Sequence, residues 1–314
     1  MNLYIFNEST RGAVYGIGTY IHELTASLRH SNMNVCVVNL GSSNHEIQIE
    51  ETGGITYYSF PAPTSLKQTL VRKKISKLYY KNVVYLLQLY IEDKKELIFH
   101  CNFINNDELA VELKKTFDCK LITTIHYFDW CFKLSGNITR FRKLLASECT
   151  DVDDSLVKEI CELYWKEKAF FESLDHIICL SENTQQILQN DYQINPNKTA
   201  VIYNGLTDIN LIPDIPTLRK KYHIPDIPII LFAGRIDDIK GLTYALRAFR
   251  IVLNTQPHCH FIIAGNGSFE TYMKECEDIW MHVTWTGLID KNRLYDFYSI
   301  ADVGVMPSFH EQCS

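Results

Sequence analysis

The feature that most constrains the fold of this chain is an alternation of short apolar runs with amphipathic stretches along all 314 residues. The apolar runs are rich in Val, Ile, Leu and Tyr, and are often apolar at consecutive positions, as expected for strands that helices cover on both faces. The stretches between them repeat apolar residues at helical spacing. This alternation predicts an α/β fold built of doubly wound parallel sheets.

Two series of apolar runs are predicted to form strands. The first series comprises Leu3–Phe6, Val35–Leu40, Ile55–Phe60, Leu97–Cys101, Leu121–His126, His176–Leu180 and Thr199–Tyr203. The second comprises Ile229–Ala233, His260–Ala264, His282–Trp285 and Val303–Met306. Helices are expected between them, at Thr19–Leu28, Asp107–Phe117, Ser155–Ala169, Asn183–Asp191, Leu242–Leu253, Phe269–Ile279 and Arg293–Ile300.

A proline-bearing stretch separates the two series. Four prolines fall within sixteen residues, at positions 213, 216, 225 and 228. Proline disfavours both helix interiors and central strands, so this composition is typical of a linker. The sequence therefore predicts a Rossmann-like domain at residues 1–208, a linker at 209–228 and a second Rossmann-like domain at 229–314. The second domain has room for only four strands, so we expect it to be incomplete.

Composition argues against several classes of protein. Lys and Arg number 31 against 37 Asp and Glu, and this net charge of −6 argues against binding of nucleic acid through bulk charge. The ten cysteines include no Cys-x-x-Cys pair, which fits buried thiols in a reducing compartment rather than a zinc ribbon. The N-terminus lacks a basic segment followed by an apolar one, so no signal peptide is predicted. We therefore expect a cytoplasmic protein with no nucleic-acid partner.

Residues 66–91 form a helical pattern with a strongly basic side. The cations on that side are Arg72, Lys73, Lys74, Lys77 and Lys81, and the opposite side carries Val71, Ile75, Leu78, Tyr85 and Leu89. An ordinary amphipathic helix with a solvated basic face explains this pattern, and so does a helix that touches an anionic acceptor or a membrane surface. Peripheral contact with the inner face of a membrane through residues 66–91 therefore stays open.

The loop after the first strand of the second series carries two cations between glycines. It reads Gly234-Arg235-Ile-Asp-Asp-Ile-Lys240-Gly241. Ligands of open α/β sheets bind beyond the carboxyl ends of the strands, and two fixed cations there can hold a diphosphate. Scattered surface cations would not explain the flanking glycines. Arg235 and Lys240 are therefore predicted to bind an anionic ligand.

Three more loops follow the remaining strands of this series. Gly265-Asn-Gly267 follows the second strand, Gly287 ends the third, and Ser308-Phe-His-Glu311 follows the fourth. The carboxyl ends of parallel strands meet at one edge of a sheet, so these loops are expected to lie together. Four such loops in a row predict a nucleotide-binding surface.

Two weaker signals lie in the first domain. Gly16-Ile-Gly18 follows the first strand and opens a helix, where free amides favour a phosphate or another anion. The stretch is not Gly-x-Gly-x-x-Gly, because position 21 is Ile, so a dehydrogenase fits poorly. A tight strand–helix turn also explains these glycines. Asn204-Gly205 follows the last strand of this domain and is common turn chemistry as well.

As a set, these motifs resemble those of the retaining GT-B glycosyltransferases of family 4, which use nucleotide sugars. In the second half the matching residues are Gly234-Arg235, Lys240-Gly241, Gly265-Asn-Gly267, Gly287, residues 294–308 and Glu311. In the first half they are residues 15–20, Thr124-Ile-His126, residues 179–184 and Tyr203-Asn204-Gly205. The resemblance covers nearly the whole chain with the spacing intact.

The resemblance implies an α/β GT-B fold and the metal-independent transfer, with retention, of a hexose from a nucleoside diphosphate sugar to a glycan, lipid or peptide acceptor. Arg235 and Lys240 would hold the donor diphosphate and stabilise the charge that develops on the leaving group. Glu311 would bind hydroxyls of the donor sugar, and His126 would lie beside the transferred sugar. The remaining donor-binding positions would be Gly16, Gly18, Asn204, Gly234, Gly265, Gly267 and Ser308.

The chain departs from the family pattern near Ser314. The family's second glutamate lies eight positions after the first, which is five residues beyond Ser314, and further βα units and a terminal helix would follow. We therefore expect a C-terminally truncated member, and the activity of the chain as written stays open. A catalytically inactive binding module is the alternative that this truncation supports.

Two other interpretations fit less well. A nucleotide-sugar epimerase or hydrolase of the same architecture would need paired acid–base carboxylates, and no such pair stands out. Asp151-Val-Asp153 matches the metal motif of the other large glycosyltransferase fold, but it precedes the helical Ser155–Ala169 instead of following a strand. Acidic residues before such a run are typical of a helix N-terminus. No His, Cys and Asp cluster indicates a metal site, so neither a metal nor another cofactor is expected.

Overall fold

The computed structural model describes residues 1–8, 16–63, 69–146, 154–208 and 213–312. Contacts divide the chain into two compact units. The first unit comprises Met1–Trp130 and Thr139–Thr207, together with the residues from Gln312 onward. The second unit comprises Cys131–Ile138 and Asp208–Glu311. Each unit contains its own sheet, so each is described by itself.

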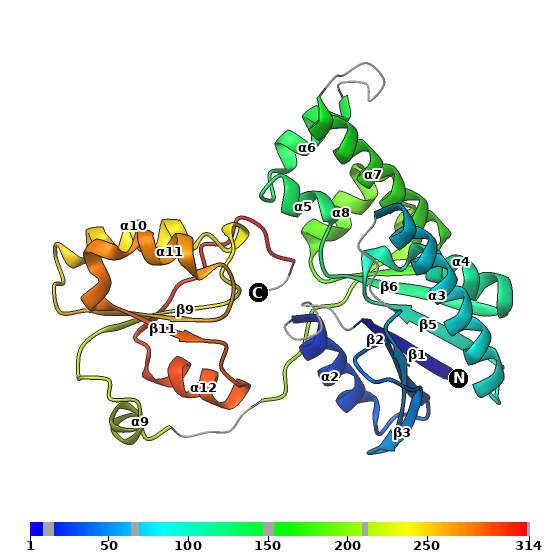
Figure 1. The fold of residues 1–314 in the computed structure, drawn as a ribbon, viewed down its shortest axis with the longest axis horizontal. Helices are drawn as coiled ribbons and strands as arrows, with labels where there is room; N and C mark the ends of the chain where they lie inside the picture. The colour runs from blue at the N-terminus through cyan, green and yellow to red at the C-terminus, as the bar shows by residue number, and fades with distance from the viewer. Residues whose placement is uncertain (9–15, 64–68, 147–153, 209–212, 313–314) are drawn as a thin grey trace. The chain divides into compact units, whose positions relative to one another are not determined.

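The first unit is built on an eight-stranded sheet in the order β3-β4-β2-β1-β5-β6-β7-β8 (Figure 1). Its strands are β1 (Asn2–Glu8), β2 (Asn34–Ser42), β3 (Gln48–Thr52), β4 (Ile55–Pro61), β5 (Leu97–Cys101), β6 (Cys119–Ile125), β7 (His176–Cys179) and β8 (Thr199–Val201). All neighbouring strands pair in parallel except β3, which pairs antiparallel with β4. The seven predicted strands are therefore confirmed, and an eighth is added.

Strand β3 corrects the expectation of a purely parallel first sheet. Gly53 and Gly54 both have positive φ and connect Thr52 to Ile55, which is the geometry of a two-residue hairpin turn. Every residue of β3 is exposed. The sequence pattern missed this strand because an exposed edge strand needs no apolar face.

The helices of this part of the chain largely follow the prediction. They are α2 (Gly16–Leu28), α3 (Thr69–Tyr90), α4 (Asp107–Thr116), α5 (Asp129–Lys133), α6 (Ile138–Ala146), α7 (Ser155–Ser173) and α8 (Glu182–Asn190), with short 3-10 turns η1 (Ile104–Asn106) and η2 (Pro196–Lys198). The Asp154 side chain accepts a hydrogen bond from the Leu156 amide and caps α7, so the predicted helix N-terminus is confirmed there. Asp151 and Asp153 lie outside the described residues.

Helix α3 packs with a different face from the one predicted. Its buried residues are Tyr80, Val83, Val84 and Leu87, at three- and four-residue spacing. Leu78, Tyr85 and Leu89, which were predicted to lie opposite the cations, are 53%, 59% and 60% exposed. They share the exposed surface with Lys77 and Lys81. The side chains of the predicted Val71, Arg72, Lys73, Lys74 and Ile75 lie outside those that the structure describes.

The second unit contains a four-stranded parallel sheet in the order β11-β10-β9-β12. Its strands are β9 (Ile229–Ala233), β10 (His260–Ala264), β11 (Val283–Gly287) and β12 (Val303–Gly304). Its remaining elements are α9 (Ile215–Lys221), η3 (Asp238–Lys240), α10 (Leu242–Leu253), α11 (Phe269–Glu275), η4 (Glu277–His282) and α12 (Lys291–Ile300). This is the doubly wound arrangement that the alternating pattern predicts.

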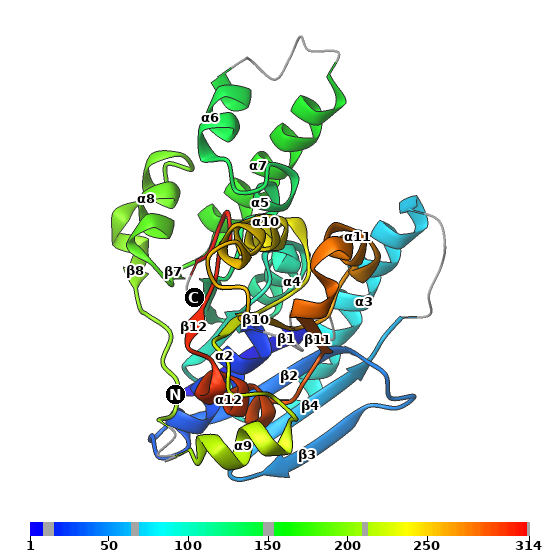
Figure 2. The ribbon, with the colours of Figure 1, turned by 90° about the vertical axis from the view of Figure 1, so that its left-hand side faces the viewer.

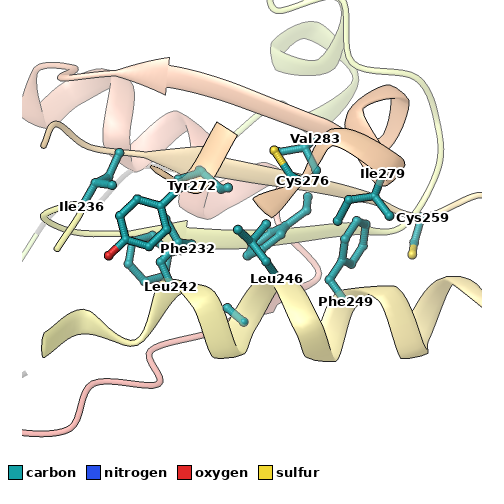
Figure 3. Close-up of a cluster of buried hydrophobic side chains, with 13 residues drawn as sticks. Phe232, Ile236, Leu242, Leu246, Phe249, Cys259, Tyr272, Cys276, Ile279 and Val283 are labelled. Carbon is teal, nitrogen blue, oxygen red and sulfur yellow. The ribbon is translucent and has the colours of Figure 1, made fainter. Parts of the chain in front are cut away.

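Helices cover both faces of this sheet. On one face, Leu242, Leu246 and Phe249 of α10 point toward Phe232 and its neighbours on the strands (Figure 3). On the other face, Phe297 and Ile300 of α12 pack on the sheet. Burial on both faces explains why β9 and β10 read as continuous apolar runs in the sequence.

Helix α9 occupies part of the stretch assigned to a linker, where the prolines predicted no helix. Pro216 stands in its first turn, where proline is tolerated because the missing amide would have no helical partner. The Asp214 carboxylate accepts from the Thr217 amide and caps the helix. Leu218 packs on the core of the second unit, and α9 lies beside α12 (Figure 2).

The cysteines only partly follow the expectation of thiols. Cys161 is disulfide-bonded. The described cysteines outside disulfides include Cys36, Cys101, Cys119, Cys179, Cys259 and Cys276. Among the described helices, none is both long and apolar enough to cross a membrane.

Candidate functional site

Three loops at the carboxyl edge of the second sheet are joined by main-chain hydrogen bonds. The Ile236 amide in the β9–α10 loop donates to the Asn266 carbonyl at 3.0 Å, and the Ser268 amide donates back to the Ile236 carbonyl at 3.2 Å. The Phe309 amide, after β12, donates to the Ile239 carbonyl at 2.8 Å. These bonds fix the loop that carries Arg235 and Lys240 between its two neighbours.

Glycine is required where these loops approach most closely. A Cβ on Gly265, whose φ is +151°, would lie 1.7 Å from the Gly234 carbonyl oxygen. A Cβ on Gly267 would lie 2.0 Å from the Ile236 carbonyl oxygen. Both distances are far below van der Waals contact, so the predicted Gly-x-Gly motif first serves to pack one loop against the other.

Asp237 organises the cationic loop. One oxygen of its carboxylate accepts from the main-chain amide of Lys240 at 3.2 Å and caps η3. The other oxygen lies 3.2 Å from a guanidinium nitrogen of Arg235. The capped turn holds the two predicted phosphate-binding residues on one short segment. Asp237 itself was not predicted from the sequence. Its position before the turn, as an Asp at the N-cap, was the available signal.

Lys240 forms an ion pair with Glu311, the residue predicted to bind the sugar. The side chains are 20% and 26% exposed, so the pair is only partly screened by water. Thus the predicted phosphate ligand and the predicted sugar ligand lie in contact. The second unit brings together the residues that the motifs assigned to one donor.

Ser308 adds a polar group to the same loops. Its hydroxyl oxygen is buried and has no hydrogen-bond partner among the residues that the structure describes. Buried hydroxyl groups without partners are uncommon, because desolvation costs free energy that a hydrogen bond would offset. Gly234, at the end of β9, leaves open space where a Cβ would stand, apart from contacts of 3.8 Å with the Phe232 ring.

Tyr272 ties the cationic loop to helix α11. Its hydroxyl donates to the Asp238 carboxylate at 2.8 Å. Burial, followed by the charge and hydrogen bond of Asp238, raises the pKa of Tyr272, so the phenol stays protonated as a donor. The cationic loop is therefore bonded to the loop after β10, to the segment after β12 and to helix α11.

In the first unit, His126 lies directly after β6 in a polar cluster. Its Nε2 is 3.1 Å from Oδ1 of Asn102, which follows the neighbouring strand β5. The Tyr20 ring of α2 meets the His126 ring edge-on, with centroids 4.8 Å apart. Burial, reinforced by nearby His100, lowers the pKa of His126 to about 3, so the imidazole is neutral at physiological pH.

Behind this histidine, Thr124 connects two further groups. Its hydroxyl is 3.0 Å from the Tyr20 hydroxyl and 2.8 Å from Nε2 of His100. Burial lowers the pKa of His100 to about 4. Asn102, Tyr20 and His100 were not predicted as neighbours of His126, although Asn102 follows a predicted strand in the same way as His126.

The other site residues predicted in the first unit are not among the residues that contact His126. Gly16 opens α2, and a Cβ placed there would meet nothing within 4 Å. Gly18 lies in the first turn of the same helix. Asn204 is exposed after β8.

Across the described ranges, no group of three or more His, Cys, Asp or Glu side chains is arranged to hold a metal ion.

Two family models match the chain, one in each half. The model described as "Glycosyltransferase Family 4" matches residues 14–208. The model described as "Glycosyl transferases group 1" matches residues 214–313.

Curated relatives carry the same kind of name. An uncharacterized glycosyltransferase of Methanocaldococcus jannaschii is 29% identical over 208 residues, which cover 60% of this chain and 52% of that protein. The alpha-D-kanosaminyltransferase of Streptomyces kanamyceticus is 30% identical over 98 residues, which cover 30% of this chain and 25% of that protein. The matched segments thus span about half, or less, of the length of these relatives.

Solved structures share the fold. Sucrose-phosphate synthase from Thermosynechococcus elongatus has a TM-score of 0.76 at 18% identity, covering 100% of this chain and 77% of that chain. The Anabaena protein Alr3699/HepE in complex with UDP-glucose has a TM-score of 0.62 at 13% identity, covering 99% of this chain and 75% of that chain. At these identities the likeness concerns the fold, and it confirms the predicted GT-B architecture.

Proposed function

Because the chain belongs to glycosyltransferase family 4, we propose that it transfers a hexose from a nucleoside diphosphate sugar to an acceptor, with retention and without a metal ion. The complex of the Anabaena structure with UDP-glucose supports a donor of this class. The proposed acceptor is a glycan, lipid or peptide.

The observation that carries the proposal is the loop from Gly234 to Gly241. Asp237 holds Arg235 and the Lys240 turn together, and neighbouring loops fix the backbone by hydrogen bonds. Two cations on a rigid segment can bind a diphosphate without a large loss of side-chain entropy. The site is therefore suited to recognise the dianionic diphosphate of the donor.

The same two cations would supply the electrostatic part of catalysis. Breaking the bond between the sugar and the diphosphate places negative charge on the departing phosphate oxygen. Arg235 and Lys240 would stabilise that charge where it develops, which is the part that a divalent ion plays in other transferases. Metal independence follows from this assignment.

Sugar recognition is assigned to Glu311 and His126. Glu311 touches Lys240, so a donor whose diphosphate binds Lys240 would bring its sugar within reach of the carboxylate. His126 is neutral, so its ring can hydrogen-bond a sugar hydroxyl without placing a positive charge beside the reacting carbon. The glycines at 16 and 18, Asn204, Gly265, Gly267 and Ser308 are proposed as the surrounding donor-binding positions.

A direct test incubates the protein with nucleotide sugars that differ in base and sugar, together with glycan, lipid and peptide acceptors. Release of nucleoside diphosphate, matched by sugar incorporated in the acceptor with retained anomeric configuration, would support the proposal. Binding of a nucleotide sugar with no transfer to any acceptor would favour a binding module instead. Conversion of the donor to an epimer would favour an epimerase.

We also propose that α3 brings the protein to an anionic membrane surface. Leu78, Tyr85 and Leu89 are exposed on α3 beside Lys77 and Lys81, so apolar and cationic groups share one face. Apolar side chains can enter the headgroup region while lysines contact anionic lipids. This arrangement supports a cytoplasmic protein with peripheral membrane contact.

Vesicle sedimentation tests the membrane contact. The protein should pellet with vesicles containing phosphatidylglycerol more than with pure phosphatidylcholine, and Tyr85→Glu should reduce the pelleted fraction. Ile251→Glu, at a residue 70% exposed on α10, is the control and should pellet like the wild type. Equal pelleting of all three proteins with both vesicles would contradict this contact.

A further inference from the structure

We propose that Asn102 fixes the imidazole of His126 in the tautomer with its proton on Nε2, so that Nδ1 faces its ligand as a hydrogen-bond acceptor. This assignment concerns a residue and a role that the family motifs do not contain. The position of the Nε2 proton stands on hydrogen-bond geometry, and the neutrality of the ring on its burial. Its use in sugar recognition rests on the proposed function.

The orientation of the Asn102 amide follows from the main chain around it. Asn102 is 1% exposed, and its Nδ2 lies 3.2 Å from the Phe6 carbonyl oxygen and 3.5 Å from the His100 carbonyl oxygen. The flipped amide would place an oxygen against these two carbonyl oxygens, with no proton between acceptors. The amide nitrogen must therefore face the carbonyls, and Oδ1 must face His126.

The tautomer of His126 follows from that orientation. An amide oxygen can only accept a hydrogen bond, so Nε2 of His126, 3.1 Å away, must carry the proton. Burial keeps the ring neutral, because desolvation disfavours its charged form. A neutral ring with a proton on Nε2 has a lone pair on Nδ1, and Nδ1 has no hydrogen-bond partner within the described ranges.

Tyr20 restricts the ring further. Its edge-on contact with the His126 imidazole, at an interplanar angle of 71°, limits rotation of the ring. The Tyr20 hydroxyl is itself held near Thr124 at 3.0 Å. A ring flip would break the Asn102 bond and leave a buried group unpaired, which is costly.

The consequence is a defined preference among ligands. An acceptor on Nδ1 pairs with a hydroxyl group of the sugar, which donates its proton. A sugar that carries hydrogen, fluorine or a methoxy group at that position has no proton to donate. The arrangement therefore selects a free hydroxyl on the transferred sugar, with Asn102 acting as a positioning residue.

Nitrogen-15 NMR of protein labelled in its histidines tests the tautomer without any need for activity. His126→Gln identifies the His126 signals by their disappearance. The wild type should show a protonated Nε2 and an unprotonated Nδ1 at pH 7. A protonated Nδ1 would overturn the inference, whatever the enzyme then does with sugars.

The matched variants are Asn102→Ala and Asn2→Ala. Both remove a buried asparagine whose side-chain amide donates to main-chain carbonyl groups, but Asn2 lies at the start of β1 and donates to the Lys95 carbonyl before β5, not to the carbonyls beside His126. Asn102→Ala should add a population with the proton on Nδ1, whereas Asn2→Ala should leave the His126 signals unchanged. Unchanged signals in folded Asn102→Ala would contradict the positioning role.

Kinetics separate this inference from the proposed function. Asn102→Ala should lower kcat/KM for the preferred nucleotide sugar about tenfold, the effect of losing one good hydrogen bond. Asn102→Ala should lower kcat/KM much less for a donor whose sugar lacks the hydroxyl group that donates to Nδ1. If the NMR result is as expected but no nucleotide sugar is used, the proposed function fails while the tautomer assignment stands.

Discussion

The ammonium group of Lys240 and the carboxylate of Glu311 form an ion pair in the second unit, although 71 positions separate them in the sequence. The pair joins the turn after β9 to the segment after β12. A ligand that recruits both residues must divide this pair, with its anionic part at Lys240 and its hydroxyl groups at Glu311. Nucleoside diphosphate sugars carry both kinds of group.

Glu311→Gln should separate the two halves of donor recognition. The substitution removes the charge that competes for Lys240, so the affinity for a free nucleoside diphosphate should rise by up to about fivefold, the value of a partly exposed ion pair. Affinity for the nucleotide sugar should fall relative to the free diphosphate, because an amide is a weaker acceptor for hydroxyl groups. Calorimetric titration of both ligands measures this ratio, and equal changes for the two ligands would speak against a sugar contact at Glu311.

Gly267→Ala should destabilise the second unit. Its new Cβ would need the space 2.0 Å from the Ile236 carbonyl oxygen, so the two loops must separate, at a cost of about 1–3 kcal/mol. Gly304→Ala in β12 is the control, since a Cβ there meets nothing within 4 Å. Urea unfolding measures both variants. Equal midpoints would show that the loops do not depend on this close approach.

The two buried histidines should make the first unit less stable at acidic pH. Their folded-state pKa values, about 4 for His100 and about 3 for His126, lie below the unfolded value of about 6.5. The unfolded chain thus binds more protons in this interval. Each histidine's contribution is fully present above pH 6.5 and is lost as the pH falls toward its folded value, with a slope of up to about 1.4 kcal/mol per pH unit.

Comparison of His126→Gln with the wild type isolates this effect from other titrating groups. The difference in unfolding free energy between the two proteins should shrink between pH 6.5 and pH 4. Exposed His176→Gln is the control and should track the wild type across this range. A His126→Gln difference that stays constant with pH would mean that the imidazole titrates normally.

Transfer should survive a chelator. Arg235 and Lys240 occupy the role that a divalent cation would have, so excess EDTA should leave the initial rate unchanged within about twofold. The assay measures nucleoside diphosphate release with the best donor and acceptor. Activity that disappears with EDTA and returns with Mn²⁺ or Mg²⁺ would contradict metal independence. It would favour Asp151 and Asp153 as metal ligands.

Much of the fold could be predicted from apolar runs that end at polar or turn residues. Strands β5, β9 and β10 and helix α10 have the bounds that the sequence predicts. The strands consist of mostly consecutive apolar residues, and the buried residues of α10 recur at three- and four-residue spacing. Strand β3 was missed because it buries nothing. Helix α9 was missed because proline was read as a breaker, whereas it is compatible with a first turn.

The site was predictable by residue type, but its pairings were not. The motifs identified Arg235, Lys240 and Glu311 without indicating that Lys240 and Glu311 touch. Similarly, the bond between Asn102 and His126 depends on the register of β5 against β6, in which Cys101 pairs with Thr123. Sequence periodicity predicts a strand but leaves its register free, so such contacts require coordinates.

Arg235 and Lys240 are proposed to bind the diphosphate of a nucleotide donor. Calorimetric titration of the protein with UDP, ADP, GDP and dTDP measures this binding, with Lys274→Ala as a control at an exposed lysine paired with Glu270. At least one of the four diphosphates should bind. Arg235→Ala and Lys240→Ala should each weaken that binding by roughly 10- to 100-fold, whereas Lys274→Ala should leave it unchanged. Wild-type affinity in both folded variants, or no binding of any of the four diphosphates, would mean that these two residues do not form a diphosphate site.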